Sequence, residues 1–127
     1  MKKNFSSSWN RSKQPRKQRK YRYNAPLHTK RKFMSVHLSK ELKQKYKKRN
    51  IGVRTGDKVR VLRGSFRKKE GKVERADVKH TKVYITGLEK VKRDGSKVLV
   101  PFEPSNLIIT DLNIDDKKRQ QTLERKK

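Results

Sequence analysis

The stretch from Val53 to Ile85 constrains the fold most, because it alternates short extended runs with glycine. Lys58–Val61, with the sequence KVRV, alternates charged and apolar residues as a half-buried strand does. Gly64 interrupts this run, the cationic loop Ser65–Glu70 follows, and Gly71 reopens an extended segment. Glycine is the residue expected where a tightly curved sheet needs a positive φ or a close backbone approach. The stretch therefore predicts a strand, a basic loop and a second strand.

The pattern of short strands continues toward the C-terminus. Lys82–Ile85 alternates cleanly, and Leu88–Arg93 is predicted to pair with Lys97–Val100 across Asp94-Gly95, a strong signal for a two-residue turn. Residues 106–112 are rich in β-branched side chains and supply a last strand. About five short strands between residues 51 and 114 predict a mostly β fold, a small barrel whose closure protects the sheet edges.

Charge divides the chain into three parts. The whole sequence holds 39 Lys or Arg against 12 Asp or Glu, a net charge of +27, and only 29% of its residues are hydrophobic. An average globular domain has about 45–50% apolar residues, so much of this chain cannot be buried in its own core. Residues 1–50, with 18 Lys or Arg and the single acid Glu41, form a basic N-terminal extension. Residues 51–114 are the barrel. Residues 115–127 are a charged C-terminal tail without a core of its own, for which a helix stays an open alternative.

The basic extension has two regions of different character. Residues 1–24 are poor in aliphatic side chains, so we expect a disordered arm when the chain is free of its partner. Leu38, Leu42 and Tyr46 recur at i, i+4 and i+8, with Ser39 placed as an N-cap, which predicts a short helix near residues 39–48. Residues 26–36 are predicted to form another helical turn or two.

Several classes of function find no support in the sequence. No run approaches the roughly 18 apolar residues of a membrane span, and no apolar segment follows the N-terminal lysines, so we expect a soluble intracellular protein without membrane insertion. Cysteine is absent, and the three histidines lack the spacing of a metal-binding helix. Asp115-Asp116 beside three cations is more simply a solvated charge cluster than a metal site. We therefore predict neither an enzyme nor a cofactor or metal.

Cations and aromatic rings are interleaved in the extension. This combination suits RNA, because cations bind phosphates and flat rings stack on unpaired bases. The alternative is a solvated polybasic tail that binds any anion. The predicted RNA contacts are Arg11, Lys13, Arg16, Lys17, Arg19, Lys20, Arg22, Arg31, Lys32, Arg63, Arg67, Lys68, Lys69, Lys72, Lys79 and His80. The candidates for stacking on bases are Trp9, Tyr21 and Tyr23. For Tyr21 and Tyr23 the alternative is packing on the barrel or on nothing.

A known motif underlies the central stretch. Residues 54–73, RTGDKVRVLRGSFRKKEGKV, resemble the KOW motif in the spacing of GDxVxV, RG and EGKV. The KOW motif occurs in ribosomal proteins and in transcription-elongation factors. Further likeness lies in residues 12–20, 24–35, 38–46, 93–96, 104–106 and 112–119. These segments resemble, in order, the universal large-subunit ribosomal protein family numbered twenty-four in bacteria and twenty-six in eukaryotes, in its archaeal and eukaryotic branch.

The resemblance implies an SH3-like barrel that binds large-subunit rRNA, chiefly its 5′ region, and acts early in subunit assembly near the exit of the peptide tunnel. It implies neighbouring large-subunit proteins as partners, and nascent-chain or targeting factors at the tunnel exit as further ones. The implied location is the cytoplasmic ribosome, with nuclear or nucleolar transit only in a eukaryotic source. Two positions depart from the family pattern. Arg67–Lys69 lacks the glycine that is usual after Phe66, and Phe102-Glu103 replaces a common isoleucine–histidine pair.

Two other functions compete with the ribosomal one. A KOW module of transcription elongation normally accompanies a second domain, and this chain has neither the length nor a repeated KOW pattern for one. A polybasic adaptor for anionic membranes or acidic proteins explains the charge of +27. It does not explain the ordered series of family-like segments, so we favour a structural RNA-binding component of the large subunit.

Overall fold

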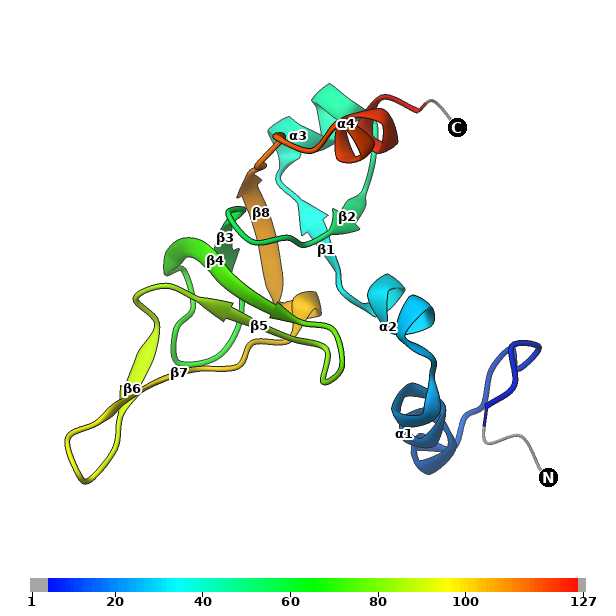
Figure 1. Ribbon diagram of the computed structural model, residues 1–127, viewed down its shortest axis with the longest axis horizontal. Helices are drawn as coiled ribbons and strands as arrows, with labels where there is room; N and C mark the ends of the chain where they lie inside the picture. Colours follow the sequence, from blue (N-terminus) through cyan, green and yellow to red (C-terminus); the bar gives the residue numbers. More distant parts are fainter. Residues whose placement is uncertain (1–4, 126–127) are drawn as a thin grey trace.

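The computed structural model describes residues 5–125, which form a small SH3-like β-barrel with helices at its periphery (Figure 1). The strands are β1 (Ser35–Leu38), β2 (Asn50–Gly52), β3 (Lys58–Val61), β4 (Glu70–Asp77), β5 (Lys82–Ile85), β6 (Glu89–Val91), β7 (Lys97–Leu99) and β8 (Leu107–Asp111). The helices are α1 (Pro15–Asn24), α2 (Leu27–Phe33), α3 (Lys40–Tyr46) and α4 (Lys117–Glu124), with a 3-10 turn at Pro104–Asn106. Six strands share one sheet in the order β2-β1-β8-β3-β4-β5, and β6 pairs only with β7.

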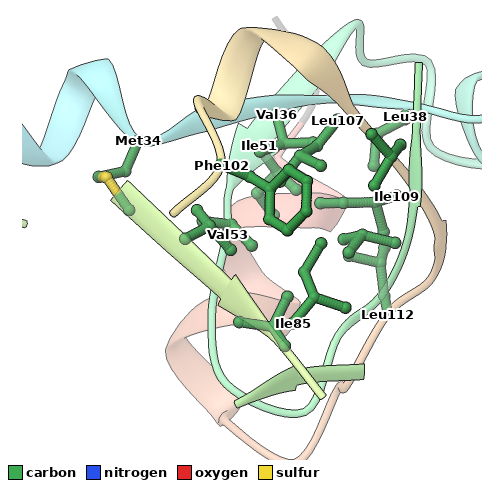
Figure 2. Packing of buried hydrophobic residues seen from close by; sticks show 14 of the residues in the cluster. Met34, Val36, Leu38, Ile51, Val53, Ile85, Phe102, Leu107, Ile109 and Leu112 are labelled. Atoms are coloured by element: carbon green, nitrogen blue, oxygen red, sulfur yellow. The ribbon is translucent and has the colours of Figure 1, made fainter. Parts of the chain in front are cut away.

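Alternation of side chains along the strands builds the core. On β3, Val59 and Val61 are buried while Lys58 and Arg60 are exposed, which confirms the strand that the KVRV pattern predicts. The same alternation buries Val83 and Ile85 on β5, and Leu107 and Ile109 on β8. Figure 2 shows Ile85, Leu107 and Ile109 among the apolar side chains that converge from several strands on one interior. The predicted β fold and its small barrel are therefore confirmed.

The sheet also recruits strands from the predicted extension. β1 lies between β2, with which it is antiparallel, and β8, with which it is parallel. Val36 and Leu38 of β1 are fully buried, so Leu38 belongs to a strand and not to the helical face of Leu42 and Tyr46. The helical turns predicted over residues 26–36 end at Phe33. The predicted boundary at residue 50 thus runs through the sheet, because β1 is one of its inner strands.

The short helix predicted near residues 39–48 is confirmed as α3. Its N-cap is Ser39, whose hydroxyl accepts the backbone N–H of Leu42 at 3.3 Å. Lys47 follows with φ 51, a left-handed conformation that ends the helix. Leu42 and Tyr46 are half-buried and pack against the core, so α3 is docked on the barrel through its apolar face.

The β6–β7 hairpin forms where the sequence predicts it and projects from the barrel (Figure 1). Its turn differs from the predicted two-residue type. Lys92 donates its N–H to the carbonyl of Ser96 at 2.9 Å, which leaves three residues in the loop. The last of these, Gly95, has φ +82, the position that glycine favours in a three-residue hairpin with a bulge.

Both ends of the described chain carry helices. The structure has α1 within the segment for which the sequence predicts a disordered arm. That expectation concerns the chain without RNA, and it stays a prediction. At the other end, α4 buries Arg119 and Leu123, so the charged tail shares the core of the barrel. No described helix has the length and apolar content to cross a bilayer.

Candidate nucleic-acid interface

The cationic loop between β3 and β4 is held in one conformation by backbone bonds. Lys68 donates its N–H to the carbonyl of Val61 at 2.8 Å, and Arg67 donates to Gly64 at 3.1 Å. Phe66 anchors the loop from below, with its ring edge-on to Phe102 at a centroid distance of 5.8 Å. The predicted contacts on this side of the barrel are Arg63, Arg67, Lys68, Lys69 and Lys72, and all five are exposed. A fixed loop with a cationic outer surface can hold phosphates in a defined register.

The turn between β4 and β5 carries the predicted contacts Lys79 and His80. The His80 ring lies with its Nδ1 atom 2.8 Å from Oδ2 of Asp77, and this hydrogen bond lowers the pKa of the Asp77 carboxyl. The Lys30 ammonium donates to the Lys79 carbonyl at 3.3 Å, which ties α2 to this turn. Lys79 and His80 are exposed. The His80 ring is thus engaged with Asp77, while the exposed Lys79 side chain is available to an anion.

The N-terminal cations lie on α1, on α2 and on the segment before them. Arg11 and Lys13 precede α1, while Arg31 and Lys32 close α2. The cations on α1 are Arg16, Lys17, Arg19, Lys20 and Arg22, and every one is exposed. Helix α1 contains no acidic residue and lies beyond α2, away from the strands (Figure 1). These two helices therefore extend a second cationic surface from the barrel.

The three candidate stacking residues have different surroundings. Trp9 and Tyr21 stack on each other with centroids 4.5 Å apart and planes 23° apart. Tyr21 also contacts the rings of Phe5 at 4.9 Å and Phe33 at 6.4 Å. Tyr23, by contrast, is 82% exposed. The structure thus brings Trp9 and Tyr21 together in a small aromatic cluster and separates Tyr23 from it.

The predicted site omits the cations of the α3 region. Lys40, Lys43 and Lys45 lie on α3, and residues 47–49 (KKR) follow it directly. Helices α3 and α4 lie at the same end of the barrel (Figure 1), where the Lys48 ammonium donates to the Thr122 carbonyl. The helical pattern of this segment is the signal that could have found these cations, because cations that flank an apolar face must point outward. This end of the molecule is a third cationic surface.

A buried ion pair holds α4 against the barrel. Arg119 and Asp57 are 3% and 0% exposed, and the two guanidinium nitrogens of Arg119 lie 2.6 and 2.7 Å from the two carboxylate oxygens of Asp57. Arg119 also donates to the carbonyl of Asn113, while Asp57 accepts the backbone N–H groups of Arg54 and Asn113. No periodic pattern marks these two residues in the sequence. The pair fixes the scaffold on which the exposed cations are mounted.

The Asp116 carboxylate, next to α4, acts as a local structural group. Asp116 is the N-cap of α4 and accepts the N–H of Lys118 at 2.8 Å. It also pairs with the Arg54 guanidinium, and this hydrogen bond lowers the pKa of the Asp116 carboxyl. Within residues 5–125, no three His, Cys, Asp or Glu side chains are grouped as a metal site would require.

Comparison with known proteins identifies the family of the chain. Residues 12–126 match the family model that describes the eukaryotic ribosomal proteins L26 and their archaeal L24 counterparts. The chain belongs to this family. Its relatives in the L26 family include a protein of Methanosphaera stadtmanae named large ribosomal subunit protein uL24, 51% identical over 91% of this chain and 98% of its own length. A protein of Korarchaeum cryptofilum with the same name is 47% identical over 91% of this chain and 88% of its own length.

The structure gives a local account of the two departures from the L26 family pattern. Lys68 has φ +69, a left-handed conformation that glycine would adopt without strain. Phe102 is 8% exposed and pairs with Val83 of β5 through two backbone bonds of 2.8 and 2.9 Å. Glu103 forms an ion pair with Lys82. Phe102 therefore serves the core, and Glu103 neutralises a neighbouring cation.

Proposed function

We propose that the chain is a structural constituent of the large ribosomal subunit that binds large-subunit rRNA. The assignment of the binding surface rests on one observation. All sixteen predicted contact residues are exposed, and among the described Lys and Arg residues only Arg119 is buried, where Asp57 neutralises it. Among residues 5–125, the only member of this set found in an ion pair is His80, which bonds Asp77, so its fifteen Lys and Arg residues are available to a polyanion. Membership of a ribosomal protein family supports rRNA as that polyanion.

The proposed mechanism divides the work between the barrel and the arm. The barrel sets the register through the fixed loop that carries Arg67 to Lys69, because its backbone geometry exists before RNA arrives. The arm supplies reach and charge, since residues 1–24 hold nine Lys or Arg and no acid. Its arginines can bind phosphates with two hydrogen bonds each or stack on bases, and its lysines act as point charges. The arm thus neutralises the phosphates of neighbouring RNA segments, which would otherwise repel each other.

The finer parts of this proposal rest on the family. We propose a role early in assembly, a place near the exit of the peptide tunnel in the cytoplasmic ribosome, and contacts with neighbouring large-subunit proteins. Nascent-chain or targeting factors at the exit would be further partners. The relatives named as large-subunit proteins support the ribosomal function over transcription elongation.

Salt dependence tests the assignment of the arm. Deletion of residues 1–24 should weaken rRNA binding and flatten the slope of log K against log salt, because each phosphate contact contributes about −0.7 to −0.9 to that slope. Replacement of Lys90 and Lys97 by Gln removes two exposed cations of β6 and β7, which lie outside the predicted contacts and outside the three cationic surfaces, and should leave the slope unchanged. An unaltered slope after the deletion would show that the arm does not touch phosphates.

Crosslinking tests the whole proposal. RNA crosslinked to the protein in cells should map to large-subunit rRNA, and the protein should sediment with the large subunit in near-stoichiometric amounts. Crosslinks spread over messenger transcripts, together with sedimentation in polymerase fractions, would contradict the ribosomal assignment.

A further inference from the structure

Helix α1 has two faces that differ in what they contact. On the inner face, Gln18 donates its side-chain N–H to the Ser12 carbonyl at 2.6 Å, and Tyr21 stacks on Trp9. Successive residues are rotated by about 100° around a helix axis, so Tyr23 points about 200° away from Tyr21. Its 82% exposure agrees with that orientation. The two tyrosines of α1 therefore cannot share one role.

The outer face of α1 combines this ring with cations. Arg16, Arg19 and Lys20 precede Tyr23 by seven, four and three residues, the spacings that place side chains on one helical face. All three cations are exposed. From the neighbouring α2, the Lys30 ammonium lies 5.9 Å from the centroid of the Tyr23 ring. An exposed aromatic ring thus lies at the end of a line of cations that spans about two helical turns.

We propose that Tyr23 is a stacking platform for one unpaired RNA base, while Arg16, Arg19 and Lys20 bind phosphates of the same strand. This inference rests on the proposed function, because it names the part of the RNA that the arm recognises. A ring stacks on any unpaired base, whereas the bases of a duplex are covered by their neighbours. The rings of Trp9 and Tyr21 stack on each other. Their role is therefore structural, because this contact holds the segment before α1 against the helix.

The test compares full-length variants that differ only in the ring. The probes are an oligo(A) strand carrying one 2-aminopurine and the duplex of the same length with oligo(U). Tyr23→Leu should lower the affinity for the single strand by roughly fivefold or more. It should also abolish the stacking-dependent change in 2-aminopurine fluorescence. Tyr23→Phe should match the wild type, and affinity for the duplex should stay unchanged in both variants.

Salt separates stacking from charge in the same experiment. Tyr23→Leu removes no phosphate contact, so the salt slope should equal that of the wild type, whereas Arg19→Gln should lower the slope. Leu27→Ala is the matched control, because Leu27 is an exposed apolar side chain of the same region and should have no effect. If Tyr23→Leu perturbs the helical circular dichroism signal, Tyr23→Trp decides the question. Its larger ring should then raise the affinity for the single strand.

Equal single-strand affinity and equal fluorescence for the wild type and Tyr23→Leu would overturn the inference, as would unchanged affinity for Tyr23→Trp. Neither result would touch the proposed function, which fails only if the wild-type protein is absent from the large subunit. The two failures are therefore distinguishable.

Discussion

Arg119 and Asp57 are both buried, with 3% and 0% of their surface exposed, and each neutralises the charge of the other. The guanidinium makes two bonds to the carboxylate, and the remaining acceptors and donors around them are backbone groups. Loss of one partner leaves an uncompensated charge in the core, which costs about 3–5 kcal/mol. The pair thus makes a single side chain of α4 decisive for the stability of the barrel.

Arg119→Met should lower the free energy of unfolding by about 3–5 kcal/mol in urea titrations. The free energy of unfolding of Arg119→Lys should lie between those of the wild type and Arg119→Met, because lysine keeps the charge but cannot bond both carboxylate oxygens as a guanidinium does. Lys118→Met, an exposed neighbour on the same helix, serves as the control and should change stability little. Equal stabilities of Arg119→Met and Lys118→Met would show that the pair contributes nothing.

Lys68 holds a left-handed backbone conformation that costs a non-glycine residue about 1–2 kcal/mol. Glycine would remove this strain, although its greater freedom in the unfolded chain costs about 0.5–1 kcal/mol. Lys68→Gly should therefore be neutral or stabilising in thermal unfolding, while Lys69→Gly, which also removes one loop charge, should destabilise. If both variants lose the same stability, the strain at Lys68 is not significant.

At the scale of elements, α3 is short enough to depend on its ends. Its seven residues begin at the Ser39 hydroxyl bond and end at the left-handed Lys47. Ser39→Ala should lower the free energy of unfolding by about 1 kcal/mol, and Ser39→Asp should restore it, because aspartate caps as well as serine. Ser105→Ala, at an exposed serine, is the control for the substitution itself. Failure of Ser39→Asp to recover stability would argue against capping.

The same elements show how far the sequence predicts the fold. Strands with alternating residues, such as β3 and β5, are recognisable because one face is buried and the other is not. β1 is hidden, because Leu38 has helical spacing to Leu42 and Tyr46 although it lies in the sheet. The core contact of α4 is hidden for another reason: it includes an arginine, and only a partner 62 residues away makes that residue a core residue.

The candidate site shows a similar division. Exposure of the predicted cations follows from composition, because so few apolar residues leave most charges outside. The different surroundings of the aromatic residues do not follow from composition. They depend on the fold of the segment before α1, which brings Trp9 onto Tyr21 and leaves Tyr23 facing outward.

For the whole molecule, a net charge of +27 means that salt acts on stability and on binding with opposite signs. Raising NaCl from about 0.05 to about 0.5 M screens repulsion within the folded protein and should raise its melting temperature. The same change should weaken rRNA binding. The variant without residues 1–24, which loses nine positive charges, should show a smaller thermal shift. A melting temperature independent of salt would mean that self-repulsion is already neutralised locally.

The strand order also determines how much of the chain must be synthesised before the barrel can close. β8 separates β1 from β3 in the sheet, and the residue that neutralises Asp57 comes later still, on α4. The ribosome making this chain must therefore add residues 107–119 before the earlier strands can close on each other. The cationic arm is made long before that point. A newly made copy therefore displays its RNA-binding end first and completes its rigid body last.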